Sequence, residues 1–457
     1  MAIKLLPGVH VPHRKNTADM TPVRMPAPKT VRIPMSMNIG RPATPIVKPG
    51  EKVQVGQKIA EAGGFVSSPI FASVSGTVKK IEDYLLSNGG VCPAILIESD
   101  GEQTMYEGLK PHEDEVTDLD SFVQAVADSG VVGLGGAGFP TAVKLKADPA
   151  KVDFICINGA ECEPYITADT RTMLDNAERL VKGMRMLYGY YKPEHVWIGI
   201  ENNKPKAIAK LKELAARIDG VDVWPLPAMY PQGGEKVLIH NITGRIVPEG
   251  KLPLDVGCIV VNPTTLVTIM RYLETGIPLV EKIVTVDGSA VKNPMNVIAP
   301  IGVSLREVIE FTGGLKEDPK KIIMGGPMMG ISVPSLDDVV IKNTNAILCL
   351  NEKDATPPEP TPCIKCGRCI AHCPLHLMPA DIETAFQMNK PEDLKALKVN
   401  ICMECGCCSY ICPARRPLVQ TNKLSKAVLN AYNAKRKADA EKKAAKEAAE
   451  KKEEVTV

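Results

Sequence analysis

The 457-residue sequence has few aromatic residues, little net charge and no long apolar run. Aromatic side chains make up 4% of it and the formal net charge is +2, so it offers neither the base-stacking side chains nor the basic surplus typical of a nucleic-acid-binding protein. Residues 1–7 lack the apolar core of a signal peptide, and no apolar stretch is long enough to cross a bilayer. We therefore expect a cytoplasmic protein with no transmembrane segment and no nucleic-acid partner.

The sequence does contain two similar runs of cysteines near its C-terminus. Both follow the pattern C-x2-C-x2-C-x3-C-P, and every cysteine of the second run is shifted along the chain by the same number of residues. In bacterial ferredoxins, three closely spaced thiolates of this pattern bind one iron–sulfur cluster and the fourth reaches the other cluster. We therefore predict two [4Fe–4S] clusters. One is held by Cys363, Cys366, Cys369 and Cys412, and the other by Cys402, Cys405, Cys408 and Cys373.

Disulfides and zinc are the alternatives for these cysteines. Eight cysteines in two phased repeats, in a chain without a secretory signal, are poorly explained by disulfides. A structural zinc site also uses C-x2-C, but it is complete with four ligands and does not need a third evenly spaced cysteine. Cys407 falls out of phase with the repeat, and we expect it to be a bystander.

The first part of the chain, residues 1–116, is expected to form a β domain. Short β-forming segments alternate with glycine and proline between residues 31 and 99, which is typical of a compact β-sandwich. The stretch resembles the barrel-sandwich fold of biotinyl and lipoyl carriers. The loop at residues 71–73, where a carrier would present its lysine, contains none, so we interpret the domain as a structural or docking module.

Residues 117–278 begin with a helical pattern that leads into a glycine-rich loop, Gly133–Pro140. The loop contains G-x-G-x-x-G, but the Rossmann form of that motif follows a strand, and this one follows a helix, so we reject that interpretation. Backbone without side chains can still approach a planar or phosphorylated ligand closely, and consecutive N–H groups can bind an anion. A glycine turn without a ligand is the alternative.

Alternating strands and helices follow the glycine loop. We expect strands at residues 152–157, 195–200, 221–226 and 258–261. The alternation predicts a mainly parallel sheet, in which ligands bind beyond the carboxyl ends of the strands. The polar segments 158–164 and 262–265 each follow a predicted strand, so we expect both of them at that edge of the sheet.

Four segments of this region resemble the flavin and NADH sites of the complex I flavoprotein subunit. They are Gly135–Thr141 together with Lys144, Asn158–Pro164, Tyr230–Glu235 and Asn262–Thr265. Combined with the N-terminal sandwich and the two ferredoxin repeats, they make the whole chain resemble the RnfC family, one of the subunit families of the Rnf ion-translocating electron transport complexes.

The resemblance implies a role for each residue that carries it. FMN would be surrounded by Gly133, Gly135, Gly136 and Lys144, with Lys144 opposite its phosphate, and the pocket would be completed by Asn158, Glu161, Tyr230, Gly233, Asn262 and Thr265. Phe139 would stack on NADH, and Glu163 and Glu235 would lie near its hydroxyls. Carboxylates accept hydrogen bonds from a ribose diol and repel a 2′-phosphate, which favours NADH over NADPH. No catalytic acid, base or nucleophile is required.

Three further segments complete the expected organisation. Residues 279–352 would form a β-grasp module of the soluble ligand-binding type, with strands around one helix and a last strand at 339–350. A proline-rich linker opens the two-cluster ferredoxin domain, residues 353–420. Residues 421–457, rich in Lys, Ala and Glu, would form a charged helical or disordered tail. The expected fold class is thus a multidomain α/β protein.

These expectations combine into one functional prediction. The chain would be a peripheral protein on the cytoplasmic side of the cell membrane, passing electrons between NADH, FMN, two [4Fe–4S] clusters and the membrane subunits of the Rnf complex. NADH gives up two electrons as a hydride whereas a cluster accepts one, so FMN is needed between them. One alternative is a non-enzymatic iron–sulfur conduit with an empty flavin pocket. The other is a diaphorase subunit of a soluble hydrogenase or formate dehydrogenase, against which the two phased cysteine runs argue.

Overall fold

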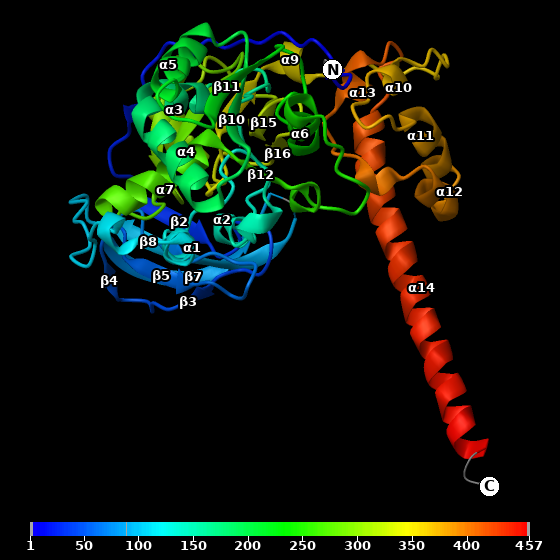
Figure 1. The fold of residues 1–457 in the computed structure, drawn as a ribbon, viewed down its shortest axis with the longest axis horizontal. Coiled ribbons are helices and arrows are strands. Elements are labelled where there is room, and N and C mark those ends of the chain that lie inside the picture. Colours follow the sequence, from blue (N-terminus) through cyan, green and yellow to red (C-terminus); the bar gives the residue numbers. More distant parts are fainter. Residues whose placement is uncertain (1–2, 88, 455–457) are drawn as a thin grey trace. The chain divides into compact units, whose positions relative to one another are not determined.

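The protein forms two compact units. The computed structural model describes the backbone of residues 3–87 and 89–454, and side chains up to residue 442 and at residue 444. One unit consists of Met1–Leu5 and His10–Thr356, and the other of Leu6–Val9 and Pro357–Val457. Figure 1 shows the elements of both units.

The N-terminal part of the first unit consists of two antiparallel sheets, which confirms the predicted barrel-sandwich. The sheets have the strand orders β2-β8-β7-β4 and β3-β5-β6. Val31 and Ile33 of β2 are completely buried, because side chains two apart on a strand point to the same face. The strands are β2 (Thr30–Pro34), β3 (Thr44–Pro45), β4 (Lys52–Val53), β5 (Lys58–Glu61), β6 (Ile70–Phe71), β7 (Gly76–Leu85) and β8 (Val91–Ser99).

The α/β part of the first unit is built on a four-stranded sheet with the order β11-β10-β9-β12, in which every pairing is parallel. Ile155 and Ile157 of β9 pack with helices α4, α5 and α7, which lie on one side of the sheet in Figure 1, while Phe154 and Cys156 pack with α6 on the other side. Helices on both faces explain why these strands are continuously apolar. The strands are β9 (Phe154–Asn158), β10 (His195–Glu201), β11 (Val221–Leu226) and β12 (Cys258–Val261).

The helices of this part precede, connect or follow these strands. α1 ends just before the glycine loop, α2 follows the loop, and α7 follows β12. They are α1 (Leu119–Asp128), α2 (Thr141–Leu145), α3 (Ala168–Asp175), α4 (Ala177–Tyr191), α5 (Pro205–Ala215), α6 (Glu235–Thr243) and α7 (Pro263–Thr275).

A six-stranded mixed sheet forms the third part of the first unit, with the order β1-β14-β13-β17-β15-β16. Leu305 and Val308 of its helix α8 (Leu305–Phe311) are buried against it. The expected strand at 339–350 is wrong in its first half: only Ala346–Leu350 is a strand, and Val339 makes one isolated bridge to Ser304. The strands are β1 (Val23–Arg24), β13 (Glu281–Asp287), β14 (Met295–Pro300), β15 (Lys321–Met324), β16 (Ile331–Val333) and β17 (Ala346–Leu350).

The second unit is helical and carries the cysteine runs. Its small core joins Leu377, Ile382 and Leu394 to Leu429 of the long helix α14. Within the described residues, no helix is both long enough and apolar enough to cross a membrane. The helices of this unit are α10 (Arg368–Ala371), α11 (Pro379–Gln387), α12 (Pro391–Ala396), α13 (Cys407–Ile411) and α14 (Leu418–Glu454), and the short α9 (Glu352–Ala355) ends the first unit.

Candidate functional site

The glycine loop after α1 presents bare backbone at the surface. A bridge between Val132 and Pro140 closes the loop at its base, and the Gly133 N–H donates to the Phe139 carbonyl at 2.8 Å. The residues at its tip, Gly135–Ala137, are exposed. A Cβ added to Gly136 would meet no atom within 4 Å, so open space lies where its side chain would be. A flat ligand can therefore approach the backbone here.

Side chains from other parts of the unit hold this loop in place. Lys282 of β13 donates to the Leu134 carbonyl at 3.0 Å, and Asn343 donates to the Gly136 carbonyl at 2.8 Å. Lys342 donates to the carbonyl of Gly130, just before the loop, at 2.8 Å. Both lysines are buried, and burial lowers the pKa of Lys282 to about 8 and that of Lys342 to about 7. Sequence reasoning missed these residues, since they are distant in sequence from the loop.

The polar residues at the ends of β9 and β12 lie beside the loop, as the parallel sheet predicts. Asn262 caps α7: its Oδ1 accepts from the Thr265 N–H at 3.1 Å, and its Nδ2 donates to Asp169 at 2.7 Å. The Thr265 hydroxyl accepts from the Leu134 N–H at 2.9 Å. A Cβ on Gly135 would come within 2.2 Å of Asn262 Nδ2, so glycine is required there by the protein's own packing.

Asn158, at the end of β9, has one half of its amide without a partner. Its Nδ2 donates to the Gly233 carbonyl at 2.8 Å, whereas its Oδ1 is buried and no atom of the described chain donates to it. Buried polar atoms are nearly always hydrogen-bonded, so an unpaired acceptor at this edge suits a ligand N–H. Gly233 itself packs closely, because a Cβ there would approach the Ala160 carbonyl to 2.4 Å.

Lys144 and Glu235 form an ion pair at the same edge of the sheet. The Lys144 ammonium donates to Glu235 Oε1 and to the Val260 carbonyl, both at 2.9 Å. Glu235 is the first residue of α6, where the helix dipole favours a carboxylate. Both side chains remain partly exposed, so the pair is weak and can open toward a ligand.

Glu161 and Glu163 are both engaged by the protein. Glu161 is 6% exposed and accepts from the Asp169 N–H at 2.8 Å and from the Thr170 hydroxyl at 2.6 Å. Glu163 accepts from the N–H groups of Met328 and Met329 at 3.0 and 2.8 Å. Burial raises the pKa of both carboxyls to about 7. The predicted pocket and ribose contacts of these two residues therefore remain predictions.

Lys15, in the N-terminal segment, anchors this acidic loop from beneath and was missed by sequence reasoning. Its ammonium donates to the carbonyls of Glu161, Glu163 and Ile166 at 2.7, 2.8 and 2.6 Å. Burial lowers its pKa, and the Glu161 carboxylate partly opposes that effect. No local sequence signal could have connected residues so far apart in the chain.

The two aromatic residues that the sequence singled out differ in exposure. Tyr230 is 1% exposed and precedes a cis peptide bond to Pro231, so its ring belongs to the core behind the site. Phe139 is half-buried at the end of the glycine loop. Only Phe139 therefore has a ring face that a ligand can reach without rearrangement.

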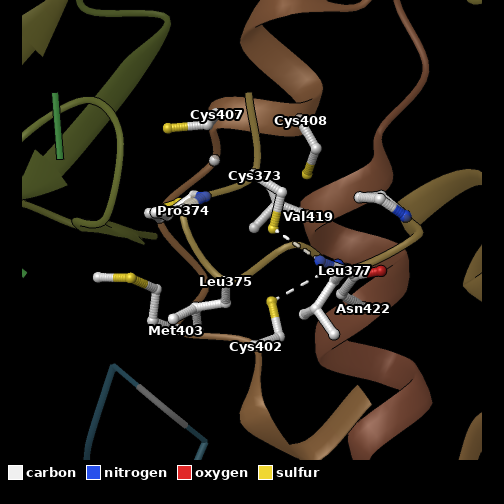
Figure 2. A pocket seen from close by; sticks show the side chains of 13 residues that line it. Cys373, Pro374, Leu375, Leu377, Cys402, Met403, Cys407, Cys408, Val419 and Asn422 are labelled. Carbon is white, nitrogen blue, oxygen red and sulfur yellow. Dashed lines mark hydrogen bonds between the residues drawn. The ribbon is translucent and has the colours of Figure 1, made fainter. Parts of the chain in front are cut away.

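In the second unit, sulfurs from both cysteine runs converge on one pocket. Figure 2 shows the sulfurs of Cys373, Cys402 and Cys408 pointing toward one another, while that of Cys407 points away from them. The pocket, also lined by Cys405, encloses about 330 Å³. The convergence fits the predicted second cluster, with Cys373 contributed by the first run.

Hydrogen bonds to sulfur surround this pocket. Cys373 accepts from the Leu377 N–H at 3.4 Å, and Cys402 accepts from the Glu404 N–H at 3.4 Å and from Asn422 Nδ2 at 3.5 Å. Burial raises the pKa of the Cys402 and Cys373 thiols. Metal coordination would have to offset that cost by holding them as thiolates.

The first run repeats the backbone of the second. Lys365 and Glu404 occupy equivalent positions and have φ values of 55° and 60°, and Gly367 and Gly406 have values of 72° and 80°.

The two runs also approach each other at the first set. Burial raises the pKa of Cys369, and the neighbouring Cys412 of the second run raises it further, which agrees with a shared first cluster. Among the described side chains, no three of the His, Cys, Asp or Glu type are close enough to hold a single metal ion. A cubane cluster is wider than an ion and needs its ligand sulfurs further apart.

Comparisons with known families divide the chain in the same way. Residues 3–102 match the RnfC barrel sandwich hybrid domain and residues 126–271 the Nuo51 FMN-binding domain. Residues 283–332 match the SLBB domain, and residues 358–446 the 4Fe-4S dicluster domain. The chain therefore combines four domain types in a mixed α/β protein.

Similar proteins span nearly the whole chain. The corresponding member of the proton-translocating ferredoxin:NAD(+) oxidoreductase complex of Clostridium ljungdahlii is 42% identical over 391 residues, covering 85% of each chain. Its Na(+)-translocating counterpart from Acetobacterium woodii is 43% identical over 385 residues, covering 84% of this chain and 87% of that protein. A crystal structure of an NAD+-reducing [NiFe]-hydrogenase aligns with 63% of this chain and 57% of its own at a TM-score of 0.47 and 20% identity, too weak a likeness to carry an argument.

Proposed function

Because the chain belongs to the RnfC family of ion-translocating ferredoxin:NAD(+) oxidoreductase (Rnf) complexes, we propose that it is the component that exchanges electrons with NADH in such a complex. The observation that carries the proposal is the joining, in one chain, of a glycine-loop pocket with an unpaired Asn158 acceptor and of two interleaved sets of cysteines. Either one alone would fit a simpler role. Together they supply a place for a two-electron donor and a route for single electrons.

The flavin pocket would lie at the carboxyl edge of the parallel sheet. Gly133, Gly135 and Gly136 would face FMN, with Asn158, Asn262 and Thr265 around it. The open space over Gly136 and the unpaired Asn158 Oδ1 support this placement. Lys144 would leave Glu235 to meet the FMN phosphate. Glu161, Tyr230 and Gly233 would shape the pocket from behind, since all three are engaged in packing or in hydrogen bonds within the protein.

NADH would bind over the flavin. Phe139 has the half-buried ring that could stack on it, and Glu235, released from Lys144, could accept from its ribose hydroxyls. Glu163 would need to exchange its contacts with Met328 and Met329 for a ribose. Bound FMN would supply the conversion of a two-electron hydride into single electrons. The protein's part would be to hold both rings in register, with no acid or base from the chain.

The cysteines would hold two [4Fe–4S] clusters with shared ligands. Cys363, Cys366, Cys369 and Cys412 would bind one, and Cys402, Cys405, Cys408 and Cys373 the other. The convergence of Cys373 with Cys402 and Cys408 supports the crossed assignment. Electrons would pass between the clusters and on to the membrane subunits of the complex, with the chain held peripherally on the cytoplasmic side of the membrane.

The finer domain organisation follows the same proposal. The barrel-sandwich domain would span residues 1–116, the FMN- and NADH-binding domain 117–278 and a β-grasp module 279–352. The mixed sheet that covers one helix, α8, supports the β-grasp description. The ferredoxin domain would span 353–420 and the charged tail 421–457.

Flavin titration of a glycine variant tests the pocket. Gly136→Val fills the open space, so we expect it to weaken FMN binding at least about tenfold, a loss of about 1.4 kcal/mol. The matched control is Gly189→Val in α4, an exposed glycine that also has open space around it. Both variants should retain the wild-type melting temperature. If Gly136→Val binds FMN as tightly as the wild-type chain, the flavin does not lie over this loop.

A second candidate function is a cluster-bearing conduit without flavin. It is favoured by one observation: Lys144, Glu161 and Glu163 already have partners within the protein. Flavin content separates the two candidates, because the cysteines would be identical in both. A purified chain that binds no FMN when FMN is supplied would support the conduit.

A further inference from the structure

We propose that the first cysteine set is the docking point for a redox protein whose own centre is surrounded by acidic residues. In the assembled complex this partner would be a neighbouring subunit. The inference rests on the proposed function, because it assumes that both cysteine sets hold clusters. It adds which of the two exchanges electrons with the partner, and what chemistry recognises that partner.

The two cysteine sets differ in exposure although their sequences repeat. Cys363 and Cys366 are exposed, whereas their counterparts Cys402 and Cys405 are half-buried and 8% exposed. All residues from 356 to 368 are exposed, so the first set is carried on a segment that reaches the surface. Electron transfer weakens steeply with distance, so a partner would exchange electrons fastest with the cluster held there.

Helix α14 is the reason for the difference. Val419 and Asn422 of α14 line the second pocket, and the Lys426 ammonium donates to the Cys402 carbonyl at 2.6 Å. The helix thereby covers the second set from one side. The pseudo-repeat is broken by this one element, and a partner can approach only the first set without displacing it.

The residues between the ligands of the first set are basic and apolar. Lys365 and Arg368 are both exposed, and Ile364 between them and Cys363 is 66% exposed. The second run instead has Glu404 in the place of Lys365, neutralised by Lys426 at 2.7 Å, and Cys407 in the place of Arg368. The positive charge is therefore confined to the exposed set.

Arg415, three residues after the ligand Cys412, adds a further exposed cation to this surface. An apolar centre with a charged rim is the composition of short-lived protein contacts, which need charge complementarity more than area. Cations around a cluster attract acidic side chains around the partner's centre. The step that follows moves one electron: one cluster is oxidised or reduced by one, the partner's centre by the opposite amount, and no bond or proton changes.

Charge reversal on the full chain, with clusters and FMN reconstituted, tests the proposal. The variant is Lys365→Glu with Arg368→Glu, and the control is Lys395→Glu with Lys435→Glu, exposed residues of the same unit that change the net charge equally. The probe is a plant-type [2Fe–2S] ferredoxin, which is acidic. We expect the wild-type chain to bind it at low ionic strength, and the first variant to bind it at least about tenfold more weakly. The control should stay within about twofold of the wild type, and added salt should remove the difference.

Stopped-flow electron transfer gives the second readout. The reduced ferredoxin should reduce the variant about tenfold more slowly than the wild-type chain, whereas cytochrome c, a basic protein, should oxidise the reduced variant faster. Variants of unchanged iron and flavin content show that the clusters are intact.

Three results would overturn the docking proposal. They are failure of the wild-type chain to bind the ferredoxin at low ionic strength, equal responses of variant and control, and a variant slowed with both probes. The proposed function fails separately, if NADH does not reduce the wild-type chain. Reduction by NADH in both variants together with any of the three results sinks only the docking surface.

Discussion

Replacing Asn422 with leucine should lower the reduction potential of the second cluster alone. Asn422 is 1% exposed, and its Nδ2 donates to Cys402 Sγ at 3.5 Å. Its Oδ1 is buried without a partner, so removal of the amide strands no other group. Leucine has a similar shape and stays buried, which keeps the change local.

The size of the shift follows from how the hydrogen bond responds to charge. A hydrogen bond to a charged group contributes about 1.5–3 kcal/mol. Reduction adds one electron to the cluster and strengthens the bond, and we take the gain as roughly half of its energy, about 1 kcal/mol. For a one-electron couple this corresponds to about 40 mV. The oxidised cluster loses less than the reduced one, so the potential falls.

Redox titration followed by EPR measures this shift, since two clusters titrate separately when their potentials differ. The control is Gln420→Leu, an exposed amide on the same helix, which should leave both potentials within about 10 mV of the wild type. An unchanged second potential, a rise, or an equal fall in both clusters would refute the reasoning.

Three further predictions concern other buried groups. Cys405→Ser should halve the iron content, whereas Cys407→Ser should leave it unchanged, because the Cys407 sulfur points away from the pocket; equal iron loss in both would contradict this. Lys342→Met should remove a pH dependence. The lowered pKa of Lys342, about 7, means that the folded chain sheds a proton that the unfolded chain keeps up to its ordinary value of 10.5, so wild-type stability should rise relative to the variant by about 2 kcal/mol from pH 7 to 9 in urea denaturation, and parallel curves would count against it. Lys15→Met leaves three carbonyls without their donor and should lower the free energy of unfolding by about 2 kcal/mol, and wild-type stability in this variant would disprove the anchoring role.

The features that the sequence predicted are those written in consecutive residues. β11 and β12 have the predicted bounds, because each is a short β-forming run between turn residues. The cysteine spacing predicts the crossed pairing that brings Cys373 to Cys402 and Cys408. The parallel order of the strands places Asn158 and Asn262 at one edge of the sheet, since carboxyl ends of parallel strands meet there.

The features that could not be predicted join segments far apart in the chain. β1 (Val23–Arg24) is only two residues long and pairs with β14, more than 270 residues later. Lys15 reaches the Glu161 loop, and Glu163 reaches Met328, through contacts that no local pattern encodes. The coverage of the second cysteine set by α14 is of the same kind. These long-range contacts decide which predicted site residues are already engaged.

The most direct test of electron entry from NADH is a visible spectrum of the anaerobic, reconstituted chain supplied with FMN, recorded before and after NADH is added. We predict that the flavin peaks and the broad cluster absorbance both bleach, because electrons pass from NADH through the flavin pocket to the two cysteine sets. A cluster absorbance that NADH leaves unchanged, in a chain with full iron content and no bound flavin, would contradict this prediction.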